Sequence, residues 1–514
     1  MTLNKITAAI CTMLACNLYA DDKQAWIVTG ESNAQTIKSM MSMVAAPNIQ
    51  SISSNDGVNI YKMASSDVAT FSEMLHVNNK KCGGYTSHES LEAAELALAQ
   101  VQASTADTLV ATSYSINNGD NVTPMVNAVN ASNIAMTIEH LSTSYTNRFY
   151  TTTSGLTSAQ WIHDNWEAIA ADRSDISVEY YEHASWDQPS VIVTITGTDS
   201  PSEVVVLGAH IDSTVGNSTG EGTFAPGADD DASGVAVLTE ALTVLVDQNY
   251  HPQKTIKLMG YAAEEVGLLG SDEIAKDYKS QGVDVIGVMQ LDMTNFHGSF
   301  EDITIFTDYT NSAQNDFLVD LIDTYQNIEV GYSSCGYGCS DHASWYQQGY
   351  AASMPFESSM SDINSNIHSA NDTLANSDAN ATTSAPFAKL ALSYMGELAK
   401  GSLGDNPNPE EPSVEVLNFS GSVSRNAQDD LGAIPAKAGT DVIVKMTGTN
   451  DADLYVALGS AASTSNWECR PYESGSSESC TVTVPADGSA PYIMVKGYSN
   501  RSASYEVTAT YTPE

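Results

Sequence analysis

The feature that most constrains the fold is the stretch from Val204 to Gly234, VVVLGAHIDSTVGNSTGEGTFAPGADDDASG. It opens with a short continuous apolar run, which is typical of a strand buried on both faces. His210 and Asp212 follow this strand, and three consecutive acids, Asp229 to Asp231, precede a segment with apolar residues at helical spacing. A histidine and carboxylates beyond the carboxyl end of a buried strand indicate part of a metal site in an α/β sheet.

The acidic triplet also has a second interpretation. Acids immediately before a helix cap its first turn and interact favourably with its dipole, and this needs no bound ion. The triplet alone does not decide between capping and metal binding, so both interpretations stay open at this point.

Length and composition restrict the architecture and the partners. A chain of 514 residues is too long for one ordinary domain. With 42% hydrophobic and 16% charged residues, it can bury a sizeable core. Its formal net charge of −43 argues against nucleic acid and against an anionic membrane as partners. We therefore expect no nucleic-acid or membrane partner. We also expect a monomer.

The first 20 residues have the pattern of a secretory signal peptide. Lys5 precedes an apolar core from Ile6 to about Cys16, and the small residue Ala20 stands at the expected cleavage point. The segment MLAC, which ends at Cys16, is a weaker match to a lipoprotein signal. No later stretch approaches the roughly 18 to 20 apolar residues that a membrane-spanning helix needs. We therefore expect a secreted, extracellular protein.

The seven cysteines divide by segment. Two belong to the signal peptide. Cys335 and Cys339 stand four apart, and Cys469 and Cys480 flank a turn-rich segment, which leaves Cys82 alone. If the region around Cys82 is removed, four cysteines remain for two local disulfides, as an oxidising compartment favours. The unpaired cysteine thus predicts a zymogen with a removable pro-region.

The remaining pattern predicts three structural parts. We assign 21–110 to a small α+β pro-region, 111–402 to a catalytic domain of alternating strands and helices, 403–412 to a proline-rich acidic linker and 413–514 to an all-β sandwich. The polar segment from Ala103 to Asn130 has little periodicity, so we expect a linker or processing region there, with the mature chain starting between about 105 and 118. Strands are expected at 191–197, 204–210, 255–262, 285–293 and 302–308.

Two further expected strands also end in acids. Glu264 and Glu265 follow one, and Asp292 follows another, where a lone charge in an apolar run is costly unless it is paired or binds an ion. A loop supplies His368, and CSDHASW supplies His342. Spacing alone does not choose between these two histidines.

Together these motifs resemble a known family, the secreted bacterial leucyl aminopeptidases with two zinc ions. The matching motifs are TNRFYTTTSG, AHIDST, APGADDDASG, YAAEEVGLLGS, QLDMTN, CGYGCSDHASW, MPFES and IHSANDTLANSD. The resemblance extends over about residues 114 to 400. It implies a central, mixed, mostly parallel sheet flanked by helices, the zinc exopeptidase fold. The N-terminal part resembles that family's pro-region, and the C-terminal part resembles the small β domain appended to many secreted bacterial peptidases.

The resemblance also implies a role for each site residue. Asp230 bridges two Zn²⁺ ions, of which one also binds His210 and Asp292 and the other binds Glu265 and His368. Glu264 is the general base, Tyr337 donates to the substrate carbonyl, and Asp212 orients His210. The pocket for the first substrate side chain is formed by Met293, Met354, Phe356 and Ile367. Two positions that are aromatic in the family's pattern are Met360 and Ile363 here.

The resemblance therefore implies a metallo-aminopeptidase that removes N-terminal leucine or another large apolar residue from peptides. Its own pro-region is expected to act as an intramolecular chaperone or as an inhibitor. One alternative is a one-zinc glutaminyl cyclase or carboxypeptidase-like hydrolase of the same fold. The other is a secreted binding protein without catalysis, which predicts a missing ligand or base.

Overall fold

The structure is a computed structural model of the whole chain, and it contains two compact units. They extend from Met1 to Gly404 and from Asp405 to Glu514. The described residues are 23–30, 33–41, 49–55, 58–79, 85–88, 90–103, 114–215, 219–335, 338–404, 415–485 and 488–513. The predicted signal peptide and Cys82 lie outside these residues, as does most of the predicted linker.

The first unit begins with a small sheet of antiparallel strands in the order β2-β3-β1-β4. Neighbouring residues of the central strand point to opposite faces: Ile27 packs with Phe71 on one face, and Val28 packs with Ala94 on the other. The strands and helices of this region are β1 (Gln24–Gly30), α1 (Ala34–Met41), β2 (Gln50–Asn55), β3 (Val58–Ala64), α2 (Ser65–Asn79), β4 (Tyr85–His88) and α3 (Leu91–Ala103).

The main sheet of the first unit has the strand order β13-β10-β7-β9-β6-β5. The first four strands run parallel, and β6 and β5 are antiparallel additions at one edge. The bounds are β5 (Ile176–Tyr181), β6 (Ser190–Ile195), β7 (Ser200–His210), β9 (Lys254–Tyr261), β10 (Asp284–Gln290) and β13 (Ala352–Ser353). The expectation of a mixed, mostly parallel sheet is thus confirmed, and β6, β7, β9 and β10 lie where strands were predicted.

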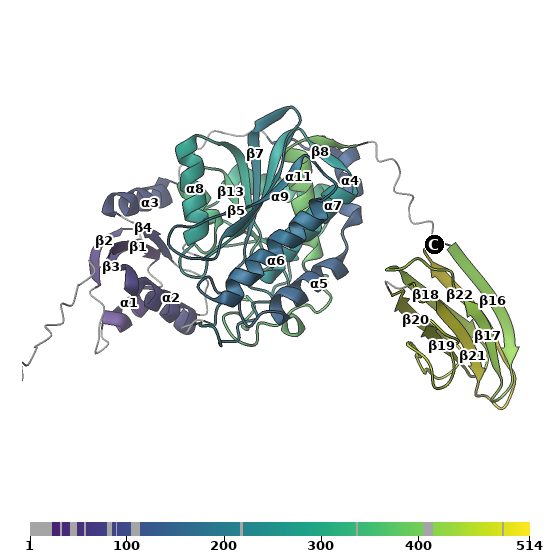
Figure 1. The fold of residues 1–514 in the computed structure, drawn as a ribbon. Coiled ribbons are helices and arrows are strands. Elements are labelled where there is room, and N and C mark those ends of the chain that lie inside the picture. The colour runs from purple at the N-terminus through teal and green to yellow at the C-terminus, as the bar shows by residue number, and fades with distance from the viewer. Residues whose placement is uncertain are drawn as a thin grey trace, which may run out of the picture. The chain divides into compact units, whose positions relative to one another are not determined.

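Helices cover both faces of this sheet (Figure 1). Two hydrophobic cores lie against the sheet, a larger and a smaller one. Val205 and Leu207 of β7 belong to the larger core, and the alternate residues Val204 and Val206 belong to the smaller core. The larger core packs on α4 (Gly119–Ala128), α5 (Ala131–Thr143), α6 (Thr153–Ala170), α7 (Ala232–Asp247), α9 (Ser312–Tyr325) and α11 (Ala385–Leu398), and the smaller on α8 (Leu269–Gln281) and α10 (His342–Gln347). Because both faces are buried, β7 reads as a continuous apolar run.

One local prediction is wrong. The segment from Ala103 to Asn130 was expected to be a linker throughout, but residues 119–128 form α4, which packs on α11 and buries Val122, Met125 and Val126. The three buried residues have helical spacing, but the helix is short and contains Gly119 and Pro124, so tertiary packing rather than local propensity stabilises it.

Short strands complete the first unit. A three-stranded sheet has the order β12-β11-β14, and β15 pairs with β8. Their bounds are β8 (Tyr250–Pro252), β11 (Ile303–Phe306), β12 (Val330–Ser333), β14 (Pro355–Phe356) and β15 (Gly401–Leu403). The loops around β11, β12 and β14 carry residues of the predicted substrate pocket.

The second unit is all-β, as predicted. One antiparallel sheet has the order β16-β22-β18-β20 and the other β17-β21-β19. In β18 every second residue is buried, and Val442, Val444 and Met446 face a shared core. A disulfide joins Cys469 to Cys480. The strands are β16 (Glu415–Val423), β17 (Gln428–Ala433), β18 (Asp441–Gly448), β19 (Ala452–Leu458), β20 (Glu478–Thr483), β21 (Pro491–Gly497) and β22 (Ala503–Tyr511).

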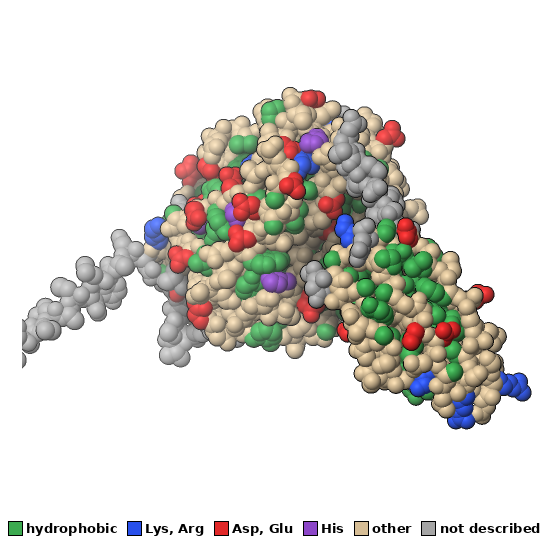
Figure 2. Space-filling model, turned by 45° about the vertical axis from the view of Figure 1, so that its right-hand side comes forward, with side chains coloured by type: hydrophobic (Ala, Val, Ile, Leu, Met, Phe, Trp, Pro, Cys, Tyr) green, Lys and Arg blue, Asp and Glu red, His purple; other side chains and the backbone are tan. Residues whose placement is uncertain are grey.

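Acidic side chains are scattered over the face of the molecule shown in Figure 2 rather than gathered in one patch. Among the described residues, every helix is too short or too polar to span a bilayer.

Candidate active site and metal centre

The predicted site residues converge at one edge of the main sheet. Strands β10, β7 and β9 are parallel neighbours, so their carboxyl ends meet there. His210 is the last residue of β7, Glu264 and Glu265 follow β9, and Asp292 follows β10. Two loops from elsewhere in the sequence bring Asp230 and His368 to the same place, and all six side chains are buried.

The two oxygens of Asp230 face two different groups of ligands. His210 Nε2 lies 2.9 Å from Asp230 Oδ1 and 3.6 Å from Asp292 Oδ1. His368 Nε2 lies 2.9 Å from Asp230 Oδ2 and 3.4 Å from Glu265 Oε2. Each histidine therefore stands with one oxygen of the shared carboxylate and with one further carboxylate.

The chemistry of this donor set fits divalent cations. Imidazole nitrogen and carboxylate oxygen are ligands that zinc accepts. Both oxygens of Glu264 and Oδ1 of Asp292 are buried without a hydrogen-bond partner among the described residues. Burial, and then the negative charge of Asp230, raises the pKa of Glu265 to about 7. So many acids in one buried space are costly unless positive charge compensates them, and His210 and His368 supply only part of it.

The histidines respond to the same crowding. Burial alone would lower the pKa of His368, but the carboxylates of Glu265 and Asp230 raise it to about 10. Without a metal ion, this imidazole therefore holds a proton that a bound cation would displace.

The three acids of the triplet make different contacts, and Asp231 as well as Asp230 has an oxygen close to His210. Asp231 caps α7, where its Oδ1 accepts from the backbone N–H of Gly234 at 2.9 Å, and its Oδ2 accepts from the N–H of His210 at 3.0 Å. Asp229 accepts from the N–H of Asn295 at 3.0 Å. Both interpretations of the triplet are thus realised, on different residues: capping on Asp231 and a place among the metal-binding groups on Asp230.

Asp212 interacts with two parts of the site. Its Oδ1 accepts from the N–H of Glu264 at 3.0 Å, and its Oδ2 accepts from the N–H of Glu265 at 3.3 Å. Nδ1 of His210 lies 3.2 Å from the backbone carbonyl oxygen of Asp212 and 3.5 Å from Oδ1. The nearer acceptor for the imidazole is thus the carbonyl, and the carboxylate mainly fixes the backbone of the two glutamates.

A small apolar cavity opens beside Asp292. The four residues predicted for the substrate pocket all line it, and five others join them; the lining is Asp292, Met293, Phe306, Cys339, Met354, Phe356, Met360, Ile363 and Ile367. Tyr337, the remaining residue with a predicted role, lies outside the described residues.

Comparisons with known proteins agree with this geometry. The sequence model of peptidase family M28 matches residues 190–394. A probable leucine aminopeptidase of Arthroderma benhamiae is 36% identical over 287 residues, which cover 55% of this chain and 77% of that protein. The chain belongs to peptidase family M28. It is therefore a metal-dependent peptide hydrolase of the aminopeptidase type.

Other M28 relatives extend the comparison. Leucine aminopeptidase 1 of Emericella nidulans is 36% identical over 298 residues, 55% of this chain and 75% of that protein. Crystal structures of LapA and LapB from Legionella pneumophila are each 28% identical, with TM-scores of 0.61 and 0.62; each covers 73% of this chain, with 98% of LapA and 100% of LapB matched. Because the two sequence relatives are fungal, they support the family but not the bacterial origin that the resemblance implied.

The second unit has a match of its own. The model of the bacterial pre-peptidase C-terminal domain covers residues 433–497, inside the β-sandwich.

Two residues of the M28 site were quoted within motifs but given no role. Asp372 accepts from the backbone N–H groups of Asp229 at 3.0 Å and Asp230 at 3.1 Å, so it fixes the loop that carries the shared ligand. Arg148 is fully buried and donates to the carbonyl oxygens of Ile211, Pro226 and Gly227, on both sides of that loop. The only sequence signal for Asp372 and Arg148 was that each is a charged residue inside one of the motifs. Their contacts do not follow from sequence spacing.

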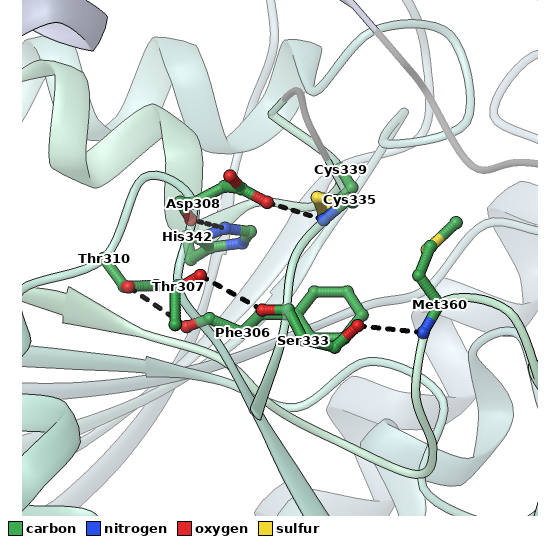
Figure 3. The surroundings of a disulfide bond; sticks show 9 residues. All are labelled: Phe306, Thr307, Asp308, Thr310, Ser333, Cys335, Cys339, His342 and Met360. Atoms are coloured by element: carbon green, nitrogen blue, oxygen red, sulfur yellow. Dashed lines mark hydrogen bonds between the residues drawn. A yellow bond between two sulfur atoms is a disulfide. The ribbon is translucent and has the colours of Figure 1, made fainter. Parts of the chain in front are cut away.

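The disulfide loop explains why His342 is not among the metal-binding groups (Figure 3). Cys335 and Cys339 are bonded, and the N–H of Cys335 donates to Asp308. Nε2 of His342 contacts the carbonyl oxygen of the same Asp308 at 3.1 Å, and burial lowers the pKa of His342 to about 4. In this M28 chain the neutral ring therefore braces the disulfide loop, and the structure brings His368 to the carboxylates.

Proposed function

We propose that the protein is a secreted aminopeptidase that uses two zinc ions to release leucine or another large apolar residue from the N-terminus of peptides. The observation that carries the proposal is the pair of ligand groups on the two oxygens of Asp230. A single carboxylate between two histidines, each with its own further acid, suits two adjacent cations better than one.

The residues divide between the ions as follows. His210, Asp292 and Oδ1 of Asp230 would hold one zinc, and His368, Glu265 and Oδ2 of Asp230 the other. When bound, zinc supplies a Lewis acid that polarises a substrate carbonyl and makes an attacking water more acidic.

Glu264 is the candidate general base. Its carboxylate is buried, has no hydrogen-bond partner among the described residues, and is held next to Glu265 by the bonds that Asp212 accepts. Burial raises the pKa of Glu264 well above its ordinary value, and Glu265 raises it further although His210 opposes the shift. A carboxyl with a raised pKa can take a proton from the attacking water and return it to the leaving amine.

The pocket supports a preference for large apolar side chains. Methionine residues at 293, 354 and 360 line it together with Phe356 and Ile367. Thioether side chains adapt their shape, so a flexible, unbranched or γ-branched residue such as leucine fits better than a charged one. The two fungal relatives named above are leucine aminopeptidases, the first of them a probable one, which supports the same preference.

Export is supported by two independent features. The first 20 residues have the pattern of a signal peptide, and both disulfides of the described residues are local bridges of the kind that oxidising compartments maintain.

The decisive experiment compares the wild type with Glu264→Gln after removal of the pro-region. We expect the wild type to bind two zinc ions and to hydrolyse leucine p-nitroanilide. The variant should keep both ions and lose activity by about 10²- to 10⁴-fold, because only the proton-transfer group changes. Glu240→Gln is the matched control, since Glu240 is a buried glutamate that accepts from Asn130 and Asn133 away from the site.

Three results would contradict the proposal. A wild type that binds two zinc ions but leaves the free-amine substrate intact is not an aminopeptidase. Binding of a single zinc favours the cyclase or carboxypeptidase-like alternative. Zinc binding without hydrolysis of any peptide substrate favours a binding protein.

A further inference from the structure

The loop that carries the two glutamates is held by a chain of side chains outside the metal centre. β6 is antiparallel to β9, so its first residue, Ser190, lies at the carboxyl end of β9. There the backbone N–H of Ala262, the first residue after β9, donates to Oγ of Ser190 at 2.9 Å. Ala263 alone separates this bond from Glu264, the proposed general base.

His183 fixes the direction of the Ser190 hydroxyl. Its Nε2 lies 2.8 Å from Oγ of Ser190, and its Nδ1 lies 2.7 Å from Oε2 of Glu273 in α8. An ionised carboxylate only accepts, so in the neutral ring Nδ1 carries the proton and Nε2 accepts from the hydroxyl of Ser190. Burial lowers the pKa of His183, although Glu273 opposes this shift, and the ring is therefore neutral near pH 7. The hydrogen bonds thus run in one direction, from the N–H of Ala262 to Glu273.

The order of serine, histidine and carboxylate is also that of a nucleophilic triad. Ser190 has no exposed surface, and its Oγ already accepts from the N–H of Ala262. A substrate carbonyl does not reach this oxygen in the fold. The three side chains therefore support the loop and do not form a second active site.

The two ends of this chain lie on either side of the catalytic loop. Ala262 precedes Glu264, and Glu273 lies in α8, the helix that follows the loop. His183, which connects them, is buried and stacks on Trp186 with ring centroids 4.5 Å apart. The start of the loop and the helix after it are thus tied together through a fixed ring.

The backbone just before the general base is strained. Ala263 has φ of +58°, a left-handed conformation that residues with a side chain adopt only where the surroundings hold it. The N–H groups on both sides of Ala263 are held by side chains: that of Ala262 by Ser190, and that of Glu264 by Asp212. Without the bond to Ser190, one side of the strained residue is free and the carboxylate of Glu264 loses its fixed place.

We propose that Ser190, His183 and Glu273 form a clamp that holds the catalytic loop and so positions Glu264 for proton transfer. All three are positioning residues, because none of them touches the metal-binding groups. The proposal rests on the proposed function, since that function gives Glu264 its task.

The first test measures hydrogen exchange in the full chain, which does not depend on activity. In Ser190→Ala the amide of Ala262 should exchange about tenfold faster than in wild type, because it loses its buried acceptor. Mass spectrometry with fragmentation of the peptide from Gly260 to Leu268 reads this rate. Ser393→Ala is the matched control, since Ser393 is a buried serine whose hydroxyl donates to Leu390 within its own helix.

The second test uses the proposed enzyme activity and separates orientation from charge. Glu273→Ala removes the acceptor of His183, whereas Glu273→Gln keeps a carbonyl oxygen in its place. With leucine p-nitroanilide, kcat of Glu273→Ala should fall about tenfold at an unchanged KM, because a displaced base weakens only the transition state. Glu273→Gln should stay within about twofold of wild type. Asp277→Ala, which removes a carboxylate of the same helix that accepts from Gln281, should match wild type.

Two results would overturn the clamp. One is an Ala262 amide that exchanges no faster in Ser190→Ala than in Ser393→Ala. The other is a Glu273→Gln enzyme that loses as much turnover as Glu273→Ala. If Ser190→Ala does not fold, His183→Phe replaces it in the exchange test, since a phenyl ring can keep the stack on Trp186. A wild type that cleaves no aminoacyl substrate while the exchange rates still differ contradicts the proposed function and leaves the clamp of the loop supported.

Discussion

Asp372 illustrates how the site depends on residues that never touch a metal ion. Its two carboxylate oxygens accept from consecutive backbone N–H groups and so set the direction of Asp230. Partners that orient a ligand commonly affect metal affinity nearly as strongly as the ligand itself.

We expect Asp372→Asn to weaken zinc binding by about 10- to 100-fold, because the amide places a donor against one of these two N–H groups. At saturating zinc, turnover should return close to the wild-type value. The measurement is a zinc titration against a competing chelator. Asp378→Asn is the control, since Asp378 bonds residues of its own loop, Asn380 and Thr383, instead of the acidic triplet. Equal zinc affinities for the two variants would contradict the role of Asp372.

At this scale the sequence predicted which residue types meet, but not how each side chain points. Glu265 and Asp292 were noted after expected strands and Asp230 before an expected helix, the resemblance implied their roles, and the structure brings all three to the two histidines. The different tasks of Asp229 and Asp231 were not predictable, because a loop has no period that fixes the direction of successive side chains.

At the scale of elements, Arg148 joins the end of β7 to the acidic loop. Its guanidinium donates to the carbonyl oxygens of Ile211 at 3.0 Å, Pro226 at 2.6 Å and Gly227 at 2.8 Å. Only a planar group with several donors can reach all three. Burial lowers the pKa of Arg148, and the carboxylates of Asp372 and Asp231 oppose this shift, so the cation also balances nearby negative charge.

Arg148→Lys should therefore lower the unfolding free energy of the first unit by about 3 kcal/mol or more, since one ammonium leaves buried carbonyl oxygens unsatisfied. Thermal unfolding followed by circular dichroism measures this loss. Arg173→Lys is the comparison. The main partner of Arg173 is Asp175, which is partly exposed and can be solvated, so this substitution should lower the unfolding free energy by less. The reverse order of the two variants would show that Arg148 is not essential to the loop.

Strands with a clear apolar pattern were predicted from the sequence, whereas a helix stabilised mainly by packing was missed. β7 and β9 were read from continuous apolar runs that reflect burial on both faces. The helix α4 was missed because its stability comes from contact with α11, which is some 260 positions away in the sequence and invisible to local reasoning.

For the whole molecule, the metal centre links stability to pH. Without metal, burial raises the pKa of Glu265 from 4.5 to about 7 and the pKa of Asp341 from 3.8 to about 7. Burial lowers the pKa of His368, but the charges of Glu265 and Asp230 outweigh this effect and raise it from 6.5 to about 10. In each case the folded chain binds a proton more tightly than the unfolded chain does. These three groups therefore contribute stability to the metal-free fold that is lost as pH rises from about 4 to 10.

We expect the melting temperature of the chelator-treated protein to fall clearly between pH 5.5 and 8.5. The zinc-loaded protein should lose less over this range, because bound cations hold the same carboxylates without protons. Differential scanning calorimetry of both forms at the two pH values provides the comparison. A metal-free form that becomes more stable at the higher pH would contradict this reading of the buried acids.

The boundary between the two compact units was easier to predict than contacts between distant segments of one unit. Composition alone identified the proline-rich acidic stretch near residue 404, where the two compact units divide. The contact of Tyr85 with Gly267 was not predictable, because no feature of either sequence segment points to the other.

The spread of the metal-binding groups along the chain has a consequence for the cell that makes the protein. The groups begin at His210 and end only at His368. A ribosome must therefore translate the chain beyond His368 before all of these groups can meet. A fragment that ends before this residue lacks part of the centre.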